Sequence, residues 1–329
     1  MPEPLSLPLD ALRATFGDRL HTGVSLAEFT TAHVGGSAEA LVIASSATEM
    51  EQAAVCLWEL EVPFHILGYG SNVLISDNGV PGVVVINRAR SIVIDANTAT
   101  PTVWAESGAL IGTIARKVGL KGLSGFEWAT TVPGTLGGAV YGNAGAFGGD
   151  MQGSLLLAEI LHPTGKEIWP VERLQYQYRS SLLKREHIPA VILAARLKLE
   201  ASDPQFVQEK MSSMSARRRS SHPPGASIGS MFKNPPGDFA GRLIEAAGLK
   251  GKRIGDAEIS SIHANFFVNH GKASAADIGS LIYTARETVA QKFGVHLELE
   301  VELLGDWSAV LNTGSAQGNN QGEPYNHER

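Results

Sequence analysis

The spacing of apolar side chains along the first 90 residues follows two different periods. Residues 47–61 carry apolar side chains three and four positions apart, which predicts an amphipathic helix, and residues 9–20 predict a shorter one. Short apolar runs of strand length lie around the longer helix and indicate buried strands. These predicted strands cover residues 39–45, 63–68, 72–77 and 82–87. The start of the chain therefore combines helices and strands.

The middle of the chain continues this mixed pattern. Residues 89–107 alternate apolar and polar side chains around a turn, which predicts a hairpin. Residues 109–122 predict a helix that ends at a glycine. A glycine-rich stretch follows. Beyond it, apolar runs predict strands at residues 155–163, 166–172 and 189–200.

A break in the pattern falls near residues 200–228, where a helical period gives way to serine, proline and glycine. Such a composition is typical of a boundary between folded units. The residues after it predict a compact unit. Its predicted elements are a helix at 240–248, a strand at 264–271, a long helix at 274–294 and a final strand at 296–305. Residues 306–329 are rich in glycine, asparagine and glutamine, which predicts a disordered tail.

The composition of the 329-residue chain is that of an ordinary globular protein, with 43% hydrophobic and 18% charged residues. This length suggests two or three packed units. A formal net charge of −6 argues against a nucleic-acid partner. No apolar run approaches the roughly 18 residues that span a bilayer, and the first residues lack the basic start and apolar core of a signal peptide. We therefore expect a cytoplasmic protein without a membrane span.

Cysteine and histidine usage predicts no metal site. The chain has one cysteine, Cys56, which excludes an intrachain disulfide and a cysteine-based metal cluster. Cys56 lies among alanines and leucines at helical spacing, so we interpret it as a small buried hydrophobic residue. The ten histidines show no ligand spacing.

Residues 134–149 hold seven glycines, although glycine costs roughly 0.5–1 kcal/mol more to order than alanine. They alternate with apolar side chains that favour burial, unlike the residues of a linker. A buried backbone rich in glycine indicates a ligand that presses against the main chain. At its start, Pro133 fixes one φ angle, and the glycines after it allow close approach. We therefore predict a ligand-binding loop, with a tightly packed turn as the alternative.

A second glycine-rich loop covers residues 68–72. Gly68-Tyr69-Gly70 resembles the opening of a dinucleotide fingerprint, but the third glycine is missing and the next segment predicts a strand instead of a helix. We predict a tight turn whose N–H groups bind an anion, or a plain hairpin turn. Ser71 and Asn72 would add side-chain donors. Two such loops suit a long ligand with a pyrophosphate.

Three further segments bring polar side chains together. The alternative for the first is an ordinary surface arginine, which is favoured without further context, and for the third a fully solvated face. Arg179 lies between a tyrosine and two serines. Ser230 follows a glycine, with Lys233 and Asn234 close behind, so a hydroxyl, an ammonium and an amide gather at the entry to the last unit. In the predicted final strand, apolar residues alternate with glutamates, which places three glutamates on one face. They are Glu298, Glu300 and Glu302.

Taken in order, seven motifs resemble the UDP-N-acetylenolpyruvoylglucosamine reductase (MurB) family of peptidoglycan synthesis. The motifs are TTAHVGG (30–36), LGYGSN (67–72), VPGTLGGAVYGNAGAFG (132–148), YRSS (178–181), GSMFKNP (229–235), HANFFVN (263–269) and LELEVELLG (297–305). Each motif alone is weak, but seven in this order are specific. The intact YRSS motif and the compact last unit resemble the shorter subtype of the family, which lacks an extra loop.

The resemblance implies an α+β fold, with a two-subdomain FAD-binding unit of the vanillyl-alcohol-oxidase (PCMH) type and a C-terminal α+β substrate domain. On this basis we divide the chain into FAD-binding subdomains at 1–88 and 89–202, a substrate-binding domain at 203–305 and the tail at 306–329. The two glycine-rich loops would bind FAD, with its pyrophosphate on backbone N–H groups. The residues implied for FAD are Gly68, Tyr69, Gly70, Ser71, Asn72, Thr131, Pro133, Gly134, Thr135, Gly138, Ala139, Asn143 and Gly145.

The resemblance also implies a reaction, the NADPH-dependent, FAD-mediated reduction of UDP-N-acetylglucosamine enolpyruvate to UDP-N-acetylmuramate. By position in the motifs, Arg179 would pair with the enolpyruvyl carboxylate, and Glu300 would lie at the same carboxylate. Ser230 would donate a proton to the adjacent carbon. The residues implied for the UDP-sugar are Lys233, Asn234 and Asn265. Only motif position distinguishes Glu300 from the two other glutamates on its face.

Two other functions are compatible with parts of this pattern. A different FAD enzyme, such as an alcohol or sugar-lactone oxidase, could use the same glycine-rich loops, but it leaves GSMFKNP and the glutamate strand without a purpose. A nucleotide-sugar sensor without catalysis is the second alternative, and the intact Arg179, Ser230 and Glu300 argue against it. We expect a small-molecule substrate and a monomer.

Overall fold

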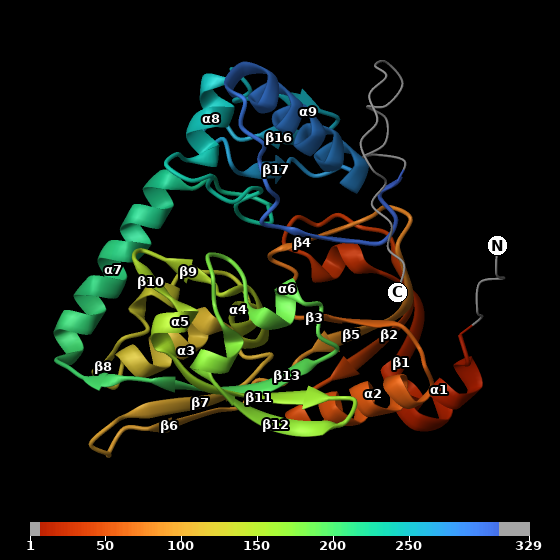
Figure 1. The fold of residues 1–329 in the computed structure, drawn as a ribbon, viewed down its shortest axis with the longest axis vertical. Helices are drawn as coiled ribbons and strands as arrows, with labels where there is room; N and C mark the ends of the chain where they lie inside the picture. Colours follow the sequence, from red (N-terminus) through yellow and green to blue (C-terminus); the bar gives the residue numbers. More distant parts are fainter. Residues whose placement is uncertain (1–6, 309–329) are drawn as a thin grey trace.

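The structure, a computed structural model, describes residues 7–308 and contains three groups of elements (Figure 1). Each group is built on its own sheet. The long helix α7 (Pro204–Ser221) runs along one side of the molecule, from the second group to the third. Helices pack beside mainly antiparallel sheets, which is the α+β class that the sequence predicts.

The first group is a four-stranded sheet in the order β1-β2-β5-β3, buried on both faces. Its strands are β1 (Leu20–Ser25), β2 (Ser37–Ala44), β3 (Phe64–Leu67) and β5 (Val80–Asn87). The last three run parallel, and β1 is antiparallel to β2. Parallel strands covered on both faces have continuous apolar runs, such as the three valines at 83–85 in β5. Helices α1 (Leu9–Phe16) and α2 (Ala47–Glu59) pack on one face.

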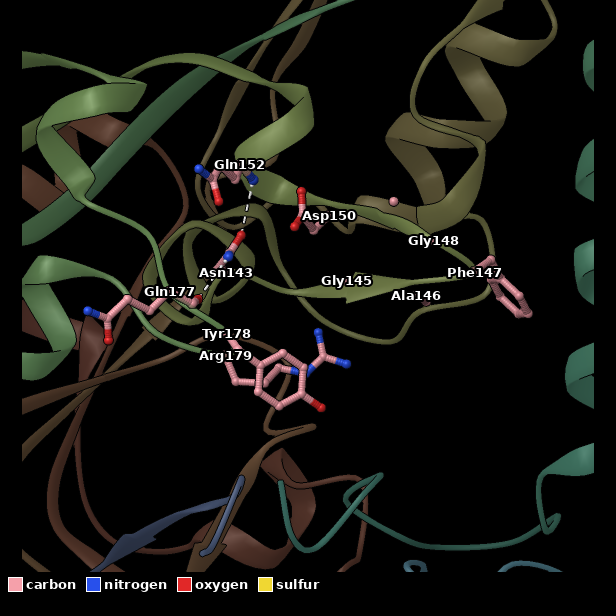
Figure 2. Close-up of a pocket in the computed structure, with 11 residues that line it drawn as sticks. Asn143, Gly145, Ala146, Phe147, Gly148, Asp150, Gln152, Gln177, Tyr178 and Arg179 are labelled. Carbon is pink, nitrogen blue, oxygen red and sulfur yellow. Dashed lines mark hydrogen bonds between the residues drawn. The ribbon is translucent and has the colours of Figure 1, made fainter. Parts of the chain in front are cut away.

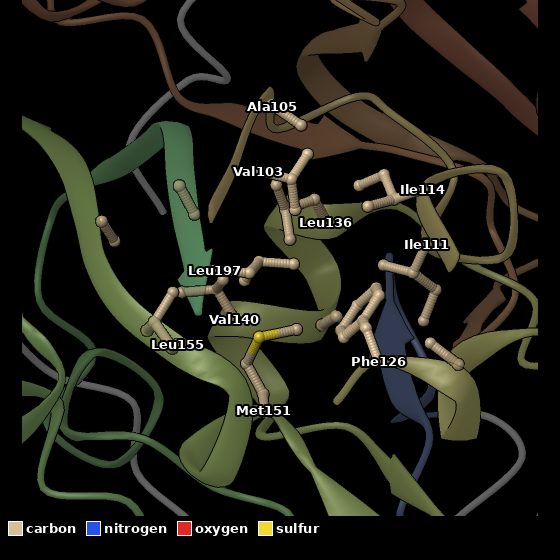
Figure 3. Packing of buried hydrophobic residues seen from close by; sticks show 14 of the residues in the cluster. Val103, Ala105, Ile111, Ile114, Phe126, Leu136, Val140, Met151, Leu155 and Leu197 are labelled. Carbon is tan, nitrogen blue, oxygen red and sulfur yellow. The ribbon is translucent and has the colours of Figure 1, made fainter. Parts of the chain in front are cut away.

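The second group is a five-stranded antiparallel sheet in the order β12-β11-β13-β7-β6. Its strands are β6 (Ile92–Asp95), β7 (Thr102–Glu106), β11 (Leu155–His162), β12 (Gly165–Pro170) and β13 (Val191–Lys198). Helices α3 (Ile111–Gly119) and α4 (Leu136–Gly142) pack on it, and Figure 3 shows their side chains meeting those of the strands around Phe126.

Short elements complete these two groups. The helices are α5 (Met151–Ser154) and α6 (Leu182–Arg185), with 3₁₀-helices η1 (Gly17–Arg19), η2 (Leu26–Phe29), η3 (Glu127–Ala129) and η4 (Val171–Leu174). The short strands form two pairs: β8 (Leu123–Ser124) with β14 (Glu200–Ala201), and β9 (Gly145–Ala146) with β10 (Gly149–Asp150).

The third group is a three-stranded antiparallel sheet, β15-β16-β17, covered by two helices. Its elements are α8 (Ala240–Ala246), β15 (Arg253–Ile254), β16 (Ala257–Ile259), β17 (Phe267–Asn269) and α9 (Ala275–Phe293). Its core also includes Ala32, Val34 and Leu74 from the first group. The third group therefore packs directly on the first.

A parallel strand pair joins the end of the third group to the first. β18 (Glu302–Leu304) pairs with β4 (Val73–Ile75), which follows the glycine-rich loop after β3. Nearby, the Asp77 carboxylate accepts hydrogen bonds from Ala275 N (2.9 Å) and Ala276 N (2.8 Å) at the start of α9. Strand pairing and side-chain bonds thus fix the two groups to each other.

The predicted elements are largely confirmed, with two differences near the glycine-rich and glutamate-rich segments. The glycine-rich stretch contains α4, where the sequence predicts only a loop. The Thr135 side chain caps this helix by accepting a hydrogen bond from Gly138 N. The predicted final strand at 296–305 is reduced to β18. Upstream of β18, Leu299 pairs with Phe232 in a loop, which keeps the alternation of side chains without a regular strand.

The predicted domain boundaries, at residues 88–89 and 202–203, fall between elements, after β5 and before α7. This division into domains stays a proposal. The predicted tail begins too early, because Trp307 is only 7% exposed and belongs to the core of the third group. Its indole Nε1 donates to Leu304 O (3.0 Å). The rest of that tail, residues 309–329, lies outside the described residues. Within residues 7–308, no helix combines the length and the apolar character that a membrane span requires.

Candidate active site

An ion pair joins two of the three residues implied for catalysis. Arg179 Nε lies 2.8 Å from Glu300 Oε1, with 25% and 17% of the two side chains exposed. The N–H is not aligned with the carboxylate, and Arg179 Nε has no hydrogen-bond partner among the described residues. The contact is therefore one of charge, made at a single edge of the guanidinium. The other N–H groups of the side chain can serve a ligand.

A tight turn presents Arg179 to this contact. Gln177 N donates to Ser180 O (2.9 Å), and Ser180 N donates to Gln177 O (3.1 Å). Arg179 lies inside the turn with φ at 56°, in the left-handed region that residues other than glycine seldom adopt. Strained backbone of this kind concentrates at functional sites. The surrounding structure therefore holds the Arg179 backbone in a conformation that arginine does not favour by itself.

Glu300 is the most buried of the three glutamates that the sequence places on one face. Each glutamate has its own cation: Glu298 pairs with Lys233, Glu300 with Arg179, and Glu302 with Lys184. The exposed fraction of the side chain is 76% for Glu298 and 42% for Glu302, against 17% for Glu300. Burial therefore distinguishes Glu300, which the sequence separates only by motif position.

Burial raises the pKa of Glu300, because a carboxylate removed from water loses hydration. The charges of Arg179, Lys184 and Lys233 oppose this rise. Burial prevails, so Glu300 keeps its proton to a higher pH than an exposed glutamate. A carboxyl group that can retain a proton beside an arginine is suited to hydrogen-bond a second carboxylate.

The loop that carries Ser230 runs beside Glu300. Glu300 N donates to Met231 O (2.9 Å). On its other side, Ser230 pairs with Phe266 in an isolated bridge. These contacts bring Ser230 and Glu300, which are far apart in the sequence, into adjacent segments. The segments that carry the three residues implied for catalysis therefore form one connected cluster.

Asn265, one of the residues implied for the UDP-sugar, holds the Ser230 loop in place instead of facing a ligand. It is 3% exposed, and its amide accepts from Phe232 N (2.9 Å) and donates to Phe232 O (2.8 Å). Burial leaves it no surface for a sugar. Lys233 pairs with a glutamate, and Asn234 Oδ1 accepts from Ala240 N (3.1 Å). Asn234 is exposed, so it and Lys233 stay predicted substrate residues.

The two glycine-rich loops contact each other next to this cluster. A Cβ on Gly68 would lie 2.4 Å from Thr135 Oγ1, so only a glycine lets the loops approach so closely. Ser71 Oγ donates to Pro133 O (3.1 Å). The sequence predicts that both loops bind one ligand, and their contact makes a shared ligand possible.

Polar groups in these loops lack protein partners, which suits a phosphate-bearing cofactor. The backbone N–H groups of residues 69–71 and of residues 134 and 135 donate to no acceptor in the part of the chain that the structure describes. Successive free N–H groups are a common anion site. Thr131 Oγ1 is buried without a partner among the same residues, and such a hydroxyl is costly unless a ligand meets it. The loops therefore fit FAD.

Two asparagines implied for FAD have protein partners. Asn72 Nδ2 donates to Glu300 O (3.0 Å). Asn143 is 4% exposed, and its amide bonds Gln152 N and Gln177 O, both at 3.0 Å (Figure 2). Both side chains bond backbone of the cluster. The amide of Asn143 is therefore engaged by the protein, where the sequence predicts a contact with FAD.

The remaining residues implied for FAD differ in exposure. Ala139 is 5% exposed and packs in the core of the second group, so its side chain is not available to a cofactor. Gly145 is needed by the protein itself, because a Cβ there would lie 2.8 Å from Asp150 Cβ. Gly138 is open, since a Cβ would approach only Thr135 Oγ1, at 3.7 Å.

A cavity of about 490 Å³ opens beside Arg179. Figure 2 shows the β9–β10 hairpin on one side of it and the turn at 177–179 on the other. Phe147 offers an aromatic ring at the tip of the hairpin, and Asp150 a carboxylate. A second cavity, of about 250 Å³, includes Tyr69 of the other loop. A concave space with an arginine in its wall can take an anionic ligand.

Lys184 also belongs to the cluster, although the sequence motifs do not single it out. Its side chain is 18% exposed and pairs with Glu302, and its charge lowers the pKa of Glu300 against the effect of burial. Ser181 accepts a hydrogen bond from Lys184 N (3.3 Å), which fixes the start of α6. The available signal is a lysine three residues after the last serine of the YRSS motif, which is the spacing of a helix N-cap.

Two parts of the chain match known families. Residues 221–304 match the UDP-N-acetylenolpyruvoylglucosamine reductase C-terminal domain, and residues 38–169 match an FAD binding domain. The UDP-N-acetylenolpyruvoylglucosamine reductase of Chloroflexus aggregans is 43% identical over 285 residues, which cover 85% of this chain and 95% of the relative. This chain belongs to the UDP-N-acetylenolpyruvoylglucosamine reductase family. The reductase of Bacillus subtilis is 39% identical over 282 residues, 85% of this chain and 92% of the relative.

A solved structure agrees with this assignment. UDP-N-acetylenolpyruvylglucosamine reductase (MurB) from Thermus caldophilus has a TM-score of 0.73 and 34% sequence identity, and the match covers 86% of this chain and 98% of that one. The resemblance carried by the seven motifs is thereby confirmed, as is the α+β fold with an FAD-binding unit.

Proposed function

We propose that Arg179, Ser230 and Glu300 are the catalytic residues of this reductase. The protein reduces UDP-N-acetylglucosamine enolpyruvate to UDP-N-acetylmuramate in peptidoglycan synthesis, with FAD as cofactor and NADPH as reductant. The observation that carries the residue assignment is the partly buried ion pair between Arg179 and Glu300, with the Ser230 loop hydrogen-bonded alongside.

The glycine-rich loops would hold FAD. The free N–H groups of residues 69–71, 134 and 135 would bind its pyrophosphate, and the buried hydroxyl of Thr131 would gain a partner. When bound, FAD supplies the redox chemistry, taking hydride from NADPH and passing it to the enolpyruvyl double bond. The residues around it supply binding, charge and a proton.

Arg179 would bind the enolpyruvyl carboxylate, because a guanidinium offers paired N–H donors that match two carboxylate oxygens. Glu300 approaches it at Nε, which leaves the terminal nitrogens for the substrate. Reduction of the double bond moves negative charge toward this carboxylate. A fixed cation in a partly buried site stabilises charge that develops in the transition state. Arg179 therefore lowers the barrier as well as binding the substrate.

Ser230 would donate its hydroxyl proton to the carbon next to the carboxylate, which completes the saturated product. Serine is a weak acid, so this step needs a strongly basic carbon within reach. Glu300 would share a proton with the same carboxylate as its charge grows, a role that its raised pKa supports. Lys233 and Asn234 would contact the UDP-sugar. We also propose that the protein acts as a cytoplasmic monomer.

The test is an anaerobic titration of the purified protein with FAD added, followed by flavin absorbance. NADPH should bleach the flavin band, and the enolpyruvyl sugar should restore it. Bleaching by simple alcohols or sugars, followed by restoration only when oxygen is admitted and none by the enolpyruvyl sugar, would favour the alternative FAD oxidase. A protein that binds no FAD would favour the sensor without catalysis.

A further inference from the structure

The segment that presents Arg179 is anchored to one end of α4. Tyr176 OH donates to Val140 O (2.8 Å), and Ser181 Oγ donates to Tyr141 O (2.7 Å). These two bonds lie on either side of the turn and attach it to carbonyl groups in the last turn of the helix. The flanks of the turn are therefore fixed, but neither bond reaches the turn itself.

A third anchor, from Asn143, does reach the turn. Asn143 follows α4 in the left-handed conformation, with φ at 47°. Its Nδ2 donates to Gln177 O, while its Oδ1 accepts from Gln152 N (Figure 2). Gln177 O also accepts from Ser180 N. The amide thus bonds the carbonyl that closes the turn around Arg179.

Only asparagine meets all the requirements of position 143. The left-handed backbone favours asparagine, aspartate or glycine. The carbonyl of Gln177 needs a donor and the N–H of Gln152 needs an acceptor, and one amide orientation supplies both. Because both ends of the amide are engaged and the side chain is buried, a contact with FAD is not needed to explain the residue.

We propose that Asn143 is a positioning residue for Arg179. It acts through the turn and sets the direction of the guanidinium, without touching the substrate or the cofactor. This inference rests on the proposed function, in which Arg179 meets the substrate carboxylate. A displacement of about 1 Å in such a contact can lower a rate on the order of a hundredfold. Loss of the Asn143 bond should therefore slow the step that depends on Arg179.

Asn143→Asp replaces the donor to Gln177 O with a charged carboxylate oxygen, while its other oxygen still accepts from Gln152 N. Aspartate also tolerates the left-handed backbone. Stopped-flow absorbance on the FAD-loaded enzyme separates the two half-reactions. Flavin reduction by NADPH should stay within about twofold of the unchanged protein, whereas reoxidation by the enolpyruvyl sugar should slow on the order of tenfold or more. The value of kcat should fall more than KM rises.

Two further variants keep the test decisive. Asn143→Gly removes both bonds without adding a charge and keeps the backbone conformation, so it should slow reoxidation at least as much, including where the aspartate variant fails to fold. Tyr176→Phe is the matched control, because it removes a buried bond from the same segment to α4 but leaves the bond to the turn. It should lower the urea midpoint as the Asn143 variants do, with reoxidation within about twofold.

A double variant tests whether the effect acts through the arginine. Adding Asn143→Asp to Arg179→Lys should cost little beyond Arg179→Lys alone. Additive losses, equal slowing by Tyr176→Phe, or weaker FAD binding with normal reoxidation would each overturn the inference. If the unchanged protein binds FAD but is not reoxidised by the enolpyruvyl sugar, the proposed function fails first, and that result is distinct from any of these.

Discussion

At the scale of single residues, surroundings separate the site from chemically identical groups nearby. Glu300 differs from its neighbours Glu298 and Glu302 in burial, although all three pair with a cation. Arg179 is strained and charge-paired, which sets it apart from an exposed surface arginine. The reactivity of each group therefore follows from the burial of its side chain and from the charges beside it.

Ser230→Ala should separate the two half-reactions of the enzyme. Without the hydroxyl, the substrate carbon loses its proton donor, so flavin reoxidation by the enolpyruvyl sugar should slow on the order of 10²-fold or more. Flavin reduction by NADPH needs no such proton and should be nearly unchanged. Stopped-flow absorbance measures both. Ser227→Ala, on the same loop, should behave normally, and equal slowing of both half-reactions by Ser230→Ala would contradict the proton-donor role.

Lys184→Met should change the pH dependence of reoxidation. The lysine charge lowers the pKa of Glu300, which burial raises, so removing this charge should raise that pKa further. The limb of the pH–rate profile that reports Glu300 should then move to higher pH, whichever protonation state is active. Lys166→Met removes a lysine from a surface ion pair with Glu51 and should leave the profile in place. An unmoved profile in Lys184→Met would show that Glu300 does not control the limb.

At the scale of elements, the sequence predicts most helices and strands but not the helix inside the glycine-rich stretch. Leu136, Ala139 and Val140 have helical spacing, between a capping Thr135 and a left-handed Asn143. These signals indicate a helix, but the seven glycines at 134–149 favour a loop. The ligand explanation accounts for only part of that glycine content. A Cβ on Gly149, for example, would lie 2.5 Å from the Trp128 ring.

The motifs predict which residues gather at the site, but not what each side chain contacts. The partner of Asn72 is Glu300 and that of Asn265 is Phe232. Both partners lie far along the chain, so no local pattern indicates that these amides bond backbone rather than ligand. Long-range hydrogen bonds decide such roles, and a single sequence does not record them.

At the scale of the whole molecule, the third group depends on the first for part of its core and for its attachment. Ala32, Val34 and Leu74 complete its buried cluster, and Asn269 Nδ2 donates to Ala32 O (2.9 Å). The proposed substrate-binding domain is thus not packed as an independent body. Changes at this junction should affect the stability of the entire chain.

Asp77→Ala should test this junction. The carboxylate caps α9 from the first group through two backbone N–H groups, and loss of a helix cap typically costs about 1 kcal/mol. Urea denaturation at neutral pH should show a destabilisation of this size. Asp10→Ala is the control, because Asp10 lies in the first turn of α1, which has no side-chain cap bond, and its loss should cost under about 0.5 kcal/mol. Equal effects of the two changes would show that the junction bond contributes nothing.

The pairing of β18 with β4 joins segments that are synthesised far apart in time. While the ribosome is still making the third group, the loops proposed for FAD can already have folded, yet β4 has no strand beside it and Glu300 does not exist. Since contacts between distant segments form slowly, the flavin loops must wait for almost the last described residues before the acid beside them is in place. A nascent chain can therefore acquire the means to hold its cofactor well before it acquires the means to use it.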